Sequence, residues 1–207
     1  MRSSVVLTLA SLLSSALAIP ADSSLSKPTG DEPTLLPVKF IDGVPESIFN
    51  ATSLGIDVFG PVPNDAIRNK DGSVTAPEGS KSNAWLRAQA DLGIYSEQLA
   101  ARGIDVSDKL SKRQGWANIR LTMWAQSNCG GQGVYWDNVE YGVSYYATTN
   151  YYAVSTTYRG LAPGERLEFR RLSGSDWCGI HHTNAFGPQN AGCYGNVPAT
   201  NCLRLYI

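Results

Sequence analysis

The sequence predicts an all-β protein: a small antiparallel β-sandwich or barrel, stabilised by two disulfides and preceded by a largely disordered propeptide with one helix. Three observations carry this prediction. All four cysteines and nine of the ten tyrosines lie after residue 113. Short runs of alternating apolar and polar residues, separated by turn residues, fill that same part of the chain, as they do in antiparallel sheets. The first residues are typical of a secretory signal, so the cysteines are expected to pair in an oxidising compartment.

The chain opens with the pattern of a signal peptide over residues 1–18. Arg2 supplies the positive charge, residues 5–13 supply a short apolar core, and Ala16-Leu17-Ala18 supplies the small residues that precede a cleavage site. The apolar run is too short to span a bilayer as a helix. We therefore expect cleavage after Ala18 and a secreted, extracellular protein without a membrane partner.

Residues 19–113 are interpreted as a propeptide. From residue 19 to about residue 80 the composition is rich in Pro, Gly, Ser and Asp, which interrupt regular structure every few residues. Few apolar residues are available to offset the chain entropy, so this stretch is expected to be mostly disordered, with a short strand near 35–41. Asn50 begins the N-glycosylation sequon Asn50-Ala51-Thr52.

Residues 83–102 are the exception in the propeptide, because their apolar residues recur at every third or fourth position, as on one face of a helix. Ser82 is a suitable N-cap, and Gly103 is a suitable residue to end the helix. Two roles fit this helix. It covers an apolar patch on the folding C-terminal domain, or it is a linker that keeps a protease site exposed; the linker is the simpler interpretation.

The dibasic pair Lys112-Arg113 separates two parts of different composition. Residues 19–113 carry 13 acids and 10 bases, whereas residues 114–207 carry 5 acids, 6 arginines and no lysine. Neither balance predicts nucleic acid or membrane lipid as a partner. A dibasic pair in a polar stretch after a signal peptide predicts cleavage by a kexin-type protease, which would leave Gln114 as the new N-terminus.

Residues 114–207 are expected to form the mature domain. Apolar and polar residues alternate in five predicted strands, at 118–123, 134–143, 152–158, 166–170 and 203–206. A phase slip at Asp137-Asn138 predicts a bulge or a turn. Pro163 and Gly164 stand in the order that a type II turn requires.

The four cysteines, Cys129, Cys178, Cys193 and Cys202, are expected to form two disulfides. Each disulfide would add roughly 2–4 kcal/mol, mainly by restricting the unfolded chain. Four cysteines allow three pairings, and the sequence alone does not choose among them. Our working hypothesis pairs Cys193 with Cys202, which closes a short loop, and Cys129 with Cys178, which joins the two halves of the domain.

Six short motifs of the mature domain consist of cysteines, turn glycines and apolar strand residues. They are Cys129-Gly130-Gly131, 135–142, Arg159-Gly160-Leu161, 164–169, Gly192-Cys193-Tyr194 and 202–205. Together they resemble small secreted cysteine-containing proteins of ascomycete fungi, many of which are treated as effector candidates. The resemblance implies a secreted, processed, non-enzymatic protein that binds an extracellular protein or glycan of a host, a competitor or the surroundings.

The tyrosine pairs Tyr145-Tyr146 and Tyr151-Tyr152 flank a predicted hairpin tip at 147–150. Exposed aromatic residues at a tip can stack on sugar rings or anchor a protein contact, so these tyrosines are the predicted binding surface. A carbohydrate-binding module is one form of this hypothesis. The competing interpretation is that alternate tyrosines line both faces of a sheet.

The segment Cys178-Gly179-Ile180-His181-His182-Thr183 and the Pro-Gly-x-Arg context of Arg166 resemble fungal guanyl-specific ribonucleases and ribotoxins. That resemblance implies Glu140 as the base, Arg166 as the phosphate ligand and His182 as the acid. The mature domain, residues 114–207, departs from this pattern, because it has no upstream histidine, no helix to pack behind the sheet and no lysines that would attract RNA. We therefore prefer the binding protein to the enzyme.

The sequence predicts no metal and no cofactor. His181 and His182 are adjacent, so on a strand their side chains point to opposite faces and do not chelate one ion together. No third ligand stands at a suitable spacing from them.

Overall fold

The computed structural model describes residues 32–101 and 116–207. The predicted signal peptide, with Ala18, and the predicted processing site at Lys112, Arg113 and Gln114 lie outside the described residues.

The described residues form thirteen strands and two helices. In chain order they are β1 (Thr34–Leu35), β2 (Phe40–Ile41), β3 (Val44–Pro45), α1 (Glu46–Ser53), β4 (Ile67–Arg68), β5 (Val74–Ala76), α2 (Lys81–Ala101), β6 (Arg120–Trp124), β7 (Gly133–Trp136), β8 (Ser144–Tyr151), β9 (Ala153–Thr157), β10 (Arg166–Ser173), β11 (Asp176–Phe186), β12 (Gly192–Gly195) and β13 (Thr200–Tyr206).

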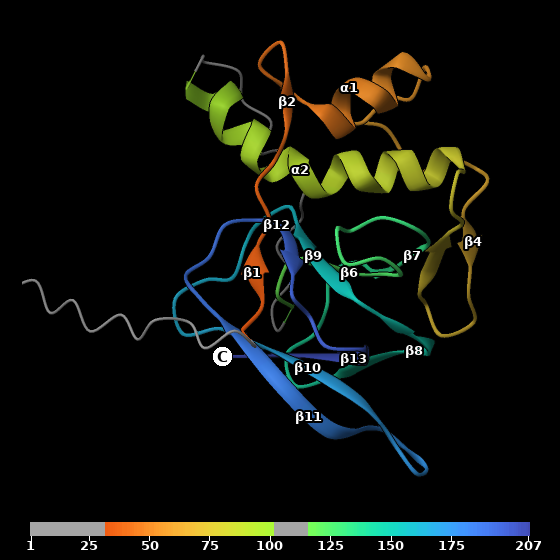
Figure 1. Cartoon of the computed structure of the whole chain (residues 1–207), viewed down its shortest axis with the longest axis vertical. Coiled ribbons are helices and arrows are strands. Elements are labelled where there is room, and N and C mark those ends of the chain that lie inside the picture. The colour runs from red at the N-terminus through yellow and green to blue at the C-terminus, as the bar shows by residue number, and fades with distance from the viewer. Residues whose placement is uncertain (1–31, 102–115) are drawn as a thin grey trace, which may run out of the picture.

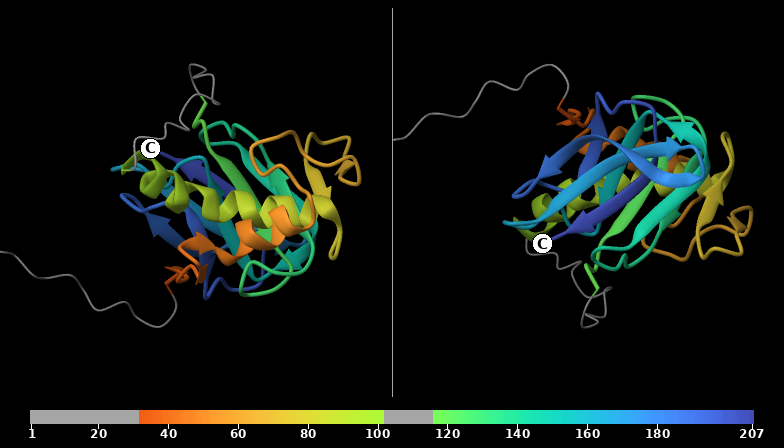
Figure 2. Two further views of the ribbon diagram at one scale, coloured as in Figure 1. Left: turned by 90° about the horizontal axis from the view of Figure 1, so that it is seen from above. Right: turned by 90° about the horizontal axis from the view of Figure 1, so that it is seen from below.

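These elements make three layers (Figures 1 and 2). A seven-stranded sheet, in the order β1-β12-β9-β6-β7-β5-β4, packs on a four-stranded sheet, in the order β11-β10-β13-β8. Helices α1 and α2 lie on the other side of the seven-stranded sheet. All strand pairs are antiparallel, so the predicted β-sandwich with two disulfides is confirmed.

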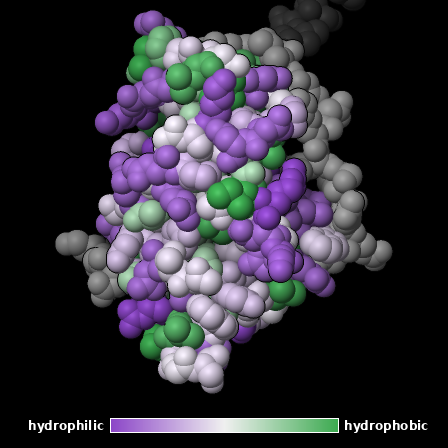
Figure 3. All heavy atoms as spheres, turned by 90° about the vertical axis from the view of Figure 1, so that its right-hand side faces the viewer, coloured by the Kyte–Doolittle hydropathy of each residue, from purple (hydrophilic) through white to green (hydrophobic). Residues whose placement is uncertain are grey.

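The main core lies between the two sheets. Leu121 and Met123 of β6 are fully buried there, as are Leu167 and Phe169 of β10 and Leu203 of β13. These are the apolar members of predicted alternating runs, so the alternation correctly predicted which residues point inward. On the side of the molecule shown in Figure 3, apolar residues appear in separate small groups among hydrophilic ones.

A second core lies between α2 and the seven-stranded sheet. Trp85 and Leu86 of α2 are buried against a cluster that includes Trp124 and Tyr135. The helix comes so close that a Cβ atom at Gly133 would lie 2.8 Å from Leu86 Cδ2. The predicted helix is confirmed, but the linker interpretation is wrong, because α2 covers the sheet.

The N-terminus of α2 is capped differently from the prediction. Asp65 accepts hydrogen bonds from the backbone N–H groups of Lys81 and Ser82, at 2.7 and 2.9 Å. The Ser80 hydroxyl accepts a third, from the N–H of Asn83, at 3.0 Å. The cap is therefore a distant aspartate together with Ser80, and Ser82 lies inside the helix.

Residues 32–80 contain more regular structure than the sequence indicated. β1 pairs with β12, β5 pairs with β7, and α1 packs on α2. The apolar residues of this stretch are far apart in sequence, but Ile48, Val58 and Val74 all join the second core. Contacts with the rest of the chain therefore stabilise what local composition did not predict.

The disulfides are Cys129–Cys193 and Cys178–Cys202. The prediction that all four cysteines pair is confirmed, but our working pairing is wrong. The sheet order explains the Cys178–Cys202 pair, because Cys178 lies on β11 and Cys202 on β13, the two strands on either side of β10. Neither disulfide connects residues 32–101 to residues 116–207, since the chain has no cysteine before Cys129.

We predict that the two disulfides differ in their contribution to stability. The loops they close span 64 and 24 residues, for Cys129–Cys193 and Cys178–Cys202 respectively. In the chain-entropy model, replacing the first pair by alanines should lower the free energy of unfolding by about 0.9 kcal/mol more than replacing the second pair. Urea denaturation of the two double variants measures this difference. The opposite order of stabilities would contradict the loop-length argument.

Candidate functional site

The outer face of the four-stranded sheet is not covered by any helix of the described structure (Figure 2, right). On β10, Leu167 and Phe169 point into the core, so Arg166, Glu168 and Arg170 point outward.

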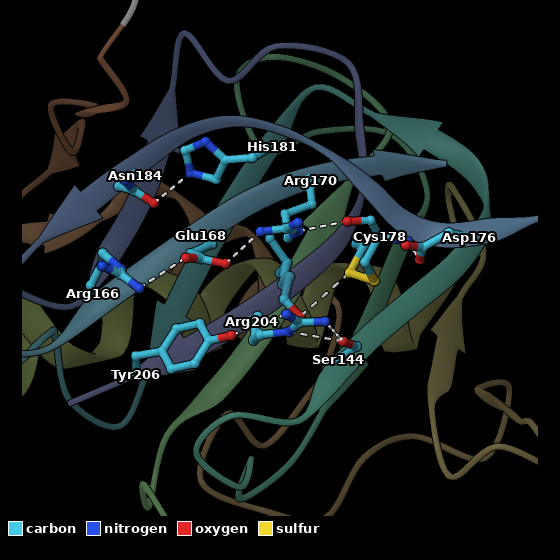
Figure 4. Close-up of polar contacts among 12 residues, drawn as sticks. Ser144, Arg166, Glu168, Arg170, Asp176, Cys178, His181, Asn184, Arg204 and Tyr206 are labelled. Carbon is cyan, nitrogen blue, oxygen red and sulfur yellow. Dashed lines mark hydrogen bonds and ion pairs between the residues drawn. A yellow bond between two sulfur atoms is a disulfide. The ribbon is translucent and has the colours of Figure 1, made fainter. Parts of the chain in front are cut away.

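The strand register arranges this face in three rows, because residues directly opposed in antiparallel strands share a face. From β8 to β11 the rows are Tyr146, Cys202, Arg170 and His181; then Ser144, Arg204, Glu168 and Asn184; and finally Tyr206, Arg166 and Phe186. We call these residues the arginine face; Figure 4 shows most of them. It contains three arginines and a single carboxylate.

Glu168 holds two of the arginines in place. Its Oε1 lies 3.0 Å from Arg166 Nη2, and its Oε2 lies 2.9 Å from Arg170 Nη1. Arg170 also donates from Nε to the carbonyl of Cys178, at 2.6 Å. The Glu168 side chain is only 9% exposed, so both of its oxygens are committed to guanidinium groups.

Arg204 differs from its neighbours, because its partners are neutral. It donates hydrogen bonds to the hydroxyl of Ser144 and to the hydroxyl of Tyr206, the latter at 3.0 Å. The Tyr206 ring is flanked by the guanidinium carbons of Arg204 and Arg166, at 6.0 and 5.0 Å from its centroid. Hydroxyl partners fix the position of Arg204, and its guanidinium forms no ion pair with Glu168, which lies opposite it on β10.

An aromatic pair stands beside the arginines. Tyr146 of β8 stacks on Trp177 of β11, with ring centroids 5.3 Å apart and an interplanar angle of 16°. Tyr146 is 41% exposed, and it belongs to the same row as Arg170. One open face therefore presents positive charge, a histidine and flat apolar surface together.

The structure does not bring the predicted catalytic residues together. Arg166 belongs to the arginine face, but the β10–β11 bulge skips His182, and His181 takes the place opposite Arg170. The Nε2 atom of His182 is buried and has no hydrogen-bond partner. Glu140 is exposed, lies opposite Trp116 in an isolated bridge, and donates its N–H to the Tyr145 hydroxyl. No hydrogen bond or ion pair links these three residues, all of which the structure describes.

The predicted tyrosine surface is divided between inside and outside. Tyr145 packs against Trp136 with ring centroids 5.9 Å apart, and Tyr151 is 2% exposed. Tyr146 and Tyr152 are exposed. The predicted hairpin tip at 147–150 is wrong, because these residues lie within β8, whose alternation sends neighbouring tyrosines to opposite sides.

Asn50, the predicted glycosylation site, is exposed on α1. Within the described residues no group of three or more His, Cys, Asp or Glu side chains is arranged to hold a metal ion. The described helices include none that is long and apolar enough to cross a membrane.

No protein-family model, curated protein or solved structure matches this chain. The case for a function therefore comes from the geometry of the arginine face.

We predict an acid-sensitive histidine next to this face. Burial lowers the pKa of His182 below its ordinary value of about 6.5, and the positive charge of Arg171 and the neighbouring His181 lower it further. The folded state thus favours neutral His182, so its stabilising contribution is present above about pH 6.5 and is lost as the pH falls through the lowered pKa. NMR titration should show this lowered pKa, and Arg171→Gln should raise it.

The matched control is Arg68→Gln, which removes an equally charged but exposed arginine from β4 on the other sheet. It should leave the pKa of His182 unchanged. A wild-type His182 that titrates at or above pH 6.5 would contradict the prediction.

Proposed function

We propose that this chain is a secreted, non-enzymatic binding protein that holds an anionic polysaccharide on its arginine face. The observation that carries the proposal is the charge pattern: Arg166, Arg170 and Arg204 share one uncovered sheet face with a single carboxylate, Glu168. Guanidinium groups bind carboxylates and sulfates with paired, charge-assisted hydrogen bonds.

A polysaccharide fits this face better than a small anion. The arginines occupy all three rows, so they offer contacts to charges that repeat along a chain. Tyr206 between the arginines and the stacked pair of Tyr146 and Trp177 supply flat apolar surfaces for sugar rings. Such a ligand also agrees with the extracellular location that the signal sequence and the disulfides predict.

Binding explains the face better than catalysis. A general base needs a carboxylate or imidazole within reach of a substrate proton. Both oxygens of Glu168 are occupied by arginines, and His181 Nε2 lies 2.9 Å from the side-chain oxygen of Asn184. The partners of these groups hold the arginines and the histidine in fixed positions, as a preformed binding surface requires.

The maturation scheme belongs to this proposal. Removal of residues 1–18 and cleavage at Lys112-Arg113 would release the protein into the extracellular space, in the manner of the ascomycete secreted proteins that its motifs resemble. The arginine face, which replaces the predicted tyrosine surface as the contact region, would then meet the ligand.

We predict that Arg204→Gln weakens the binding of a carboxylated or sulfated polysaccharide about tenfold, which corresponds to about 1.4 kcal/mol. The variant removes the cation that has only neutral partners, while glutamine keeps a donor for Ser144. Isothermal titration calorimetry measures the affinity, which should also fall as salt is added. Arg68→Gln, with the same loss of charge on the other sheet, should bind like the wild type.

Two results would overturn the proposed function. Equal polysaccharide affinities of the wild type and Arg204→Gln would show that the arginine face does not bind the ligand. Cleavage of RNA by the wild type, abolished in His181→Ala, would identify a ribonuclease instead.

A further inference from the structure

We infer that residues 32–101 are a permanent subunit of the folded protein: they stay bound to residues 116–207 when the chain between them is cut. If the proposed cleavage at Lys112-Arg113 takes place, the secreted molecule is then a two-chain complex rather than the C-terminal domain alone. The inference uses this cleavage from the proposed function, but it does not depend on the arginine face.

The N-terminal segment supplies both edges of the seven-stranded sheet. β1 pairs with β12 at one edge, and the β4–β5 hairpin pairs with β7 at the other. Beyond β1, the N–H of Leu36 donates to the carbonyl of Cys193 at 2.7 Å. Loss of the segment would leave β12 and β7 as unpaired strand edges, which invite aggregation.

Helix α2 closes the outer face of the same sheet. Leu86, 1% exposed, fills the space above Gly133, and the side chain of Asn83 donates to the carbonyl of Gly131 at 2.9 Å. Trp85 packs on Tyr135, with ring centroids 6.5 Å apart. These contacts connect the two parts by side-chain packing as well as by backbone pairing.

The sheet surface under α2 is largely apolar. Trp124 and Ala153 are fully buried there, and so is Cys129 with its disulfide. A fragment without α2 would expose these residues together with Tyr135 as one apolar surface, and monomeric proteins rarely expose such patches. The surface therefore needs an occupant, and residues 32–101 are built to fit it.

The complex would be held without a covalent link. All four cysteines lie in the C-terminal part, and both disulfides close within it. Detergent without a reducing agent should thus separate the two fragments, whereas native conditions should not. The arginine face lies on the four-stranded sheet, on the opposite side of the seven-stranded sheet from α2 (Figure 2), so its ligand and the fragment interface are tested separately.

The first experiment cuts the full chain from residue 19 onward with a kexin-type protease and follows the product by size-exclusion chromatography and native mass spectrometry. We expect both fragments in one peak, at the mass of the uncut protein plus one water. If the dibasic pair resists cutting, a chain whose residues 104–113 are replaced by a site-specific protease sequence gives the same product. Release of a folded C-terminal fragment, with unchanged circular dichroism, would overturn the inference.

A matched pair of variants tests the interface itself. In the cut protein, Leu86→Ala removes side-chain packing against the sheet and should raise the dissociation constant of the two fragments at least about 30-fold. Phe49→Ala changes an exposed residue on α1 and should raise it less than about threefold. If Leu86→Ala does not fold, Asn83→Ala, which removes the side-chain hydrogen bonds to the carbonyls of Gly131 and Ala76, should still accelerate fragment exchange. Equal dissociation constants for wild type and the interface variants would refute the assigned contacts.

Polysaccharide binding by the cut protein is measured separately, which keeps the two proposals apart. Co-eluting fragments that bind no polysaccharide would retain the subunit inference and reject the proposed ligand. If the fragments separate and the C-terminal fragment still binds the polysaccharide, the subunit inference is rejected and the proposed ligand is retained.

Discussion

The junction between helix α2 and the seven-stranded sheet is built around Arg120, a cation that is 3% exposed. Its guanidinium carbon lies 4.8 Å from the Trp85 ring of α2 and 4.5 Å from the Tyr135 ring of β7. Its Nε atom is 2.5 Å from Asp137, and Gln89 of α2 accepts a weaker bond at 3.4 Å. Burying a charge is costly unless it is paired and hydrogen-bonded. The compensation for Arg120 comes from both the helix and the sheet, so neither layer is complete without the other.

Because α2 packs on only one of the two sheets, the outer face of the seven-stranded sheet is covered and that of the four-stranded sheet is open to water. The centre of the seven-stranded sheet is buried on both sides: β6 sends Leu121 and Met123 into the sandwich and Thr122 and Trp124 toward α2, and all four are 0% exposed. The four-stranded sheet has only one covered side. Charged residues on its other side keep their contact with water, which is where a ligand could reach them.

Residue patterns predicted those features that are set locally and failed for those set by the pairing of distant segments. Alternation predicted β6, β7, β9, β10 and β13 but not β8, β11 or β12. Pro163-Gly164 predicted the turn, where Gly164 has a φ of 86° and the N–H of Glu165 donates to the carbonyl of Ala162. The single short strand expected near 35–41 is instead two strands, β1 and β2, and β1 is set by its distant partner β12. The pattern of Arg166, Glu168 and Arg170 was visible, but the register that places Arg204 opposite Glu168 was not, so the arginine face was missed. The disulfide pairing was missed for the same reason.

The placement of carboxylates separates structural arginines from those available to a ligand. In the C-terminal part, Asp137 compensates Arg120, and Glu165, 4% exposed, takes two hydrogen bonds from Arg159, both 2.7 Å long. In each of these pairs at least one charge is buried, Arg120 in the first and Glu165 in the second. On the arginine face one carboxylate serves two arginines, and Arg204 has hydroxyl partners alone. A carboxylate ion-paired with Arg204 would compete with an anionic ligand. Hydroxyl partners orient the guanidinium without neutralising its charge, as a surface that binds anions requires.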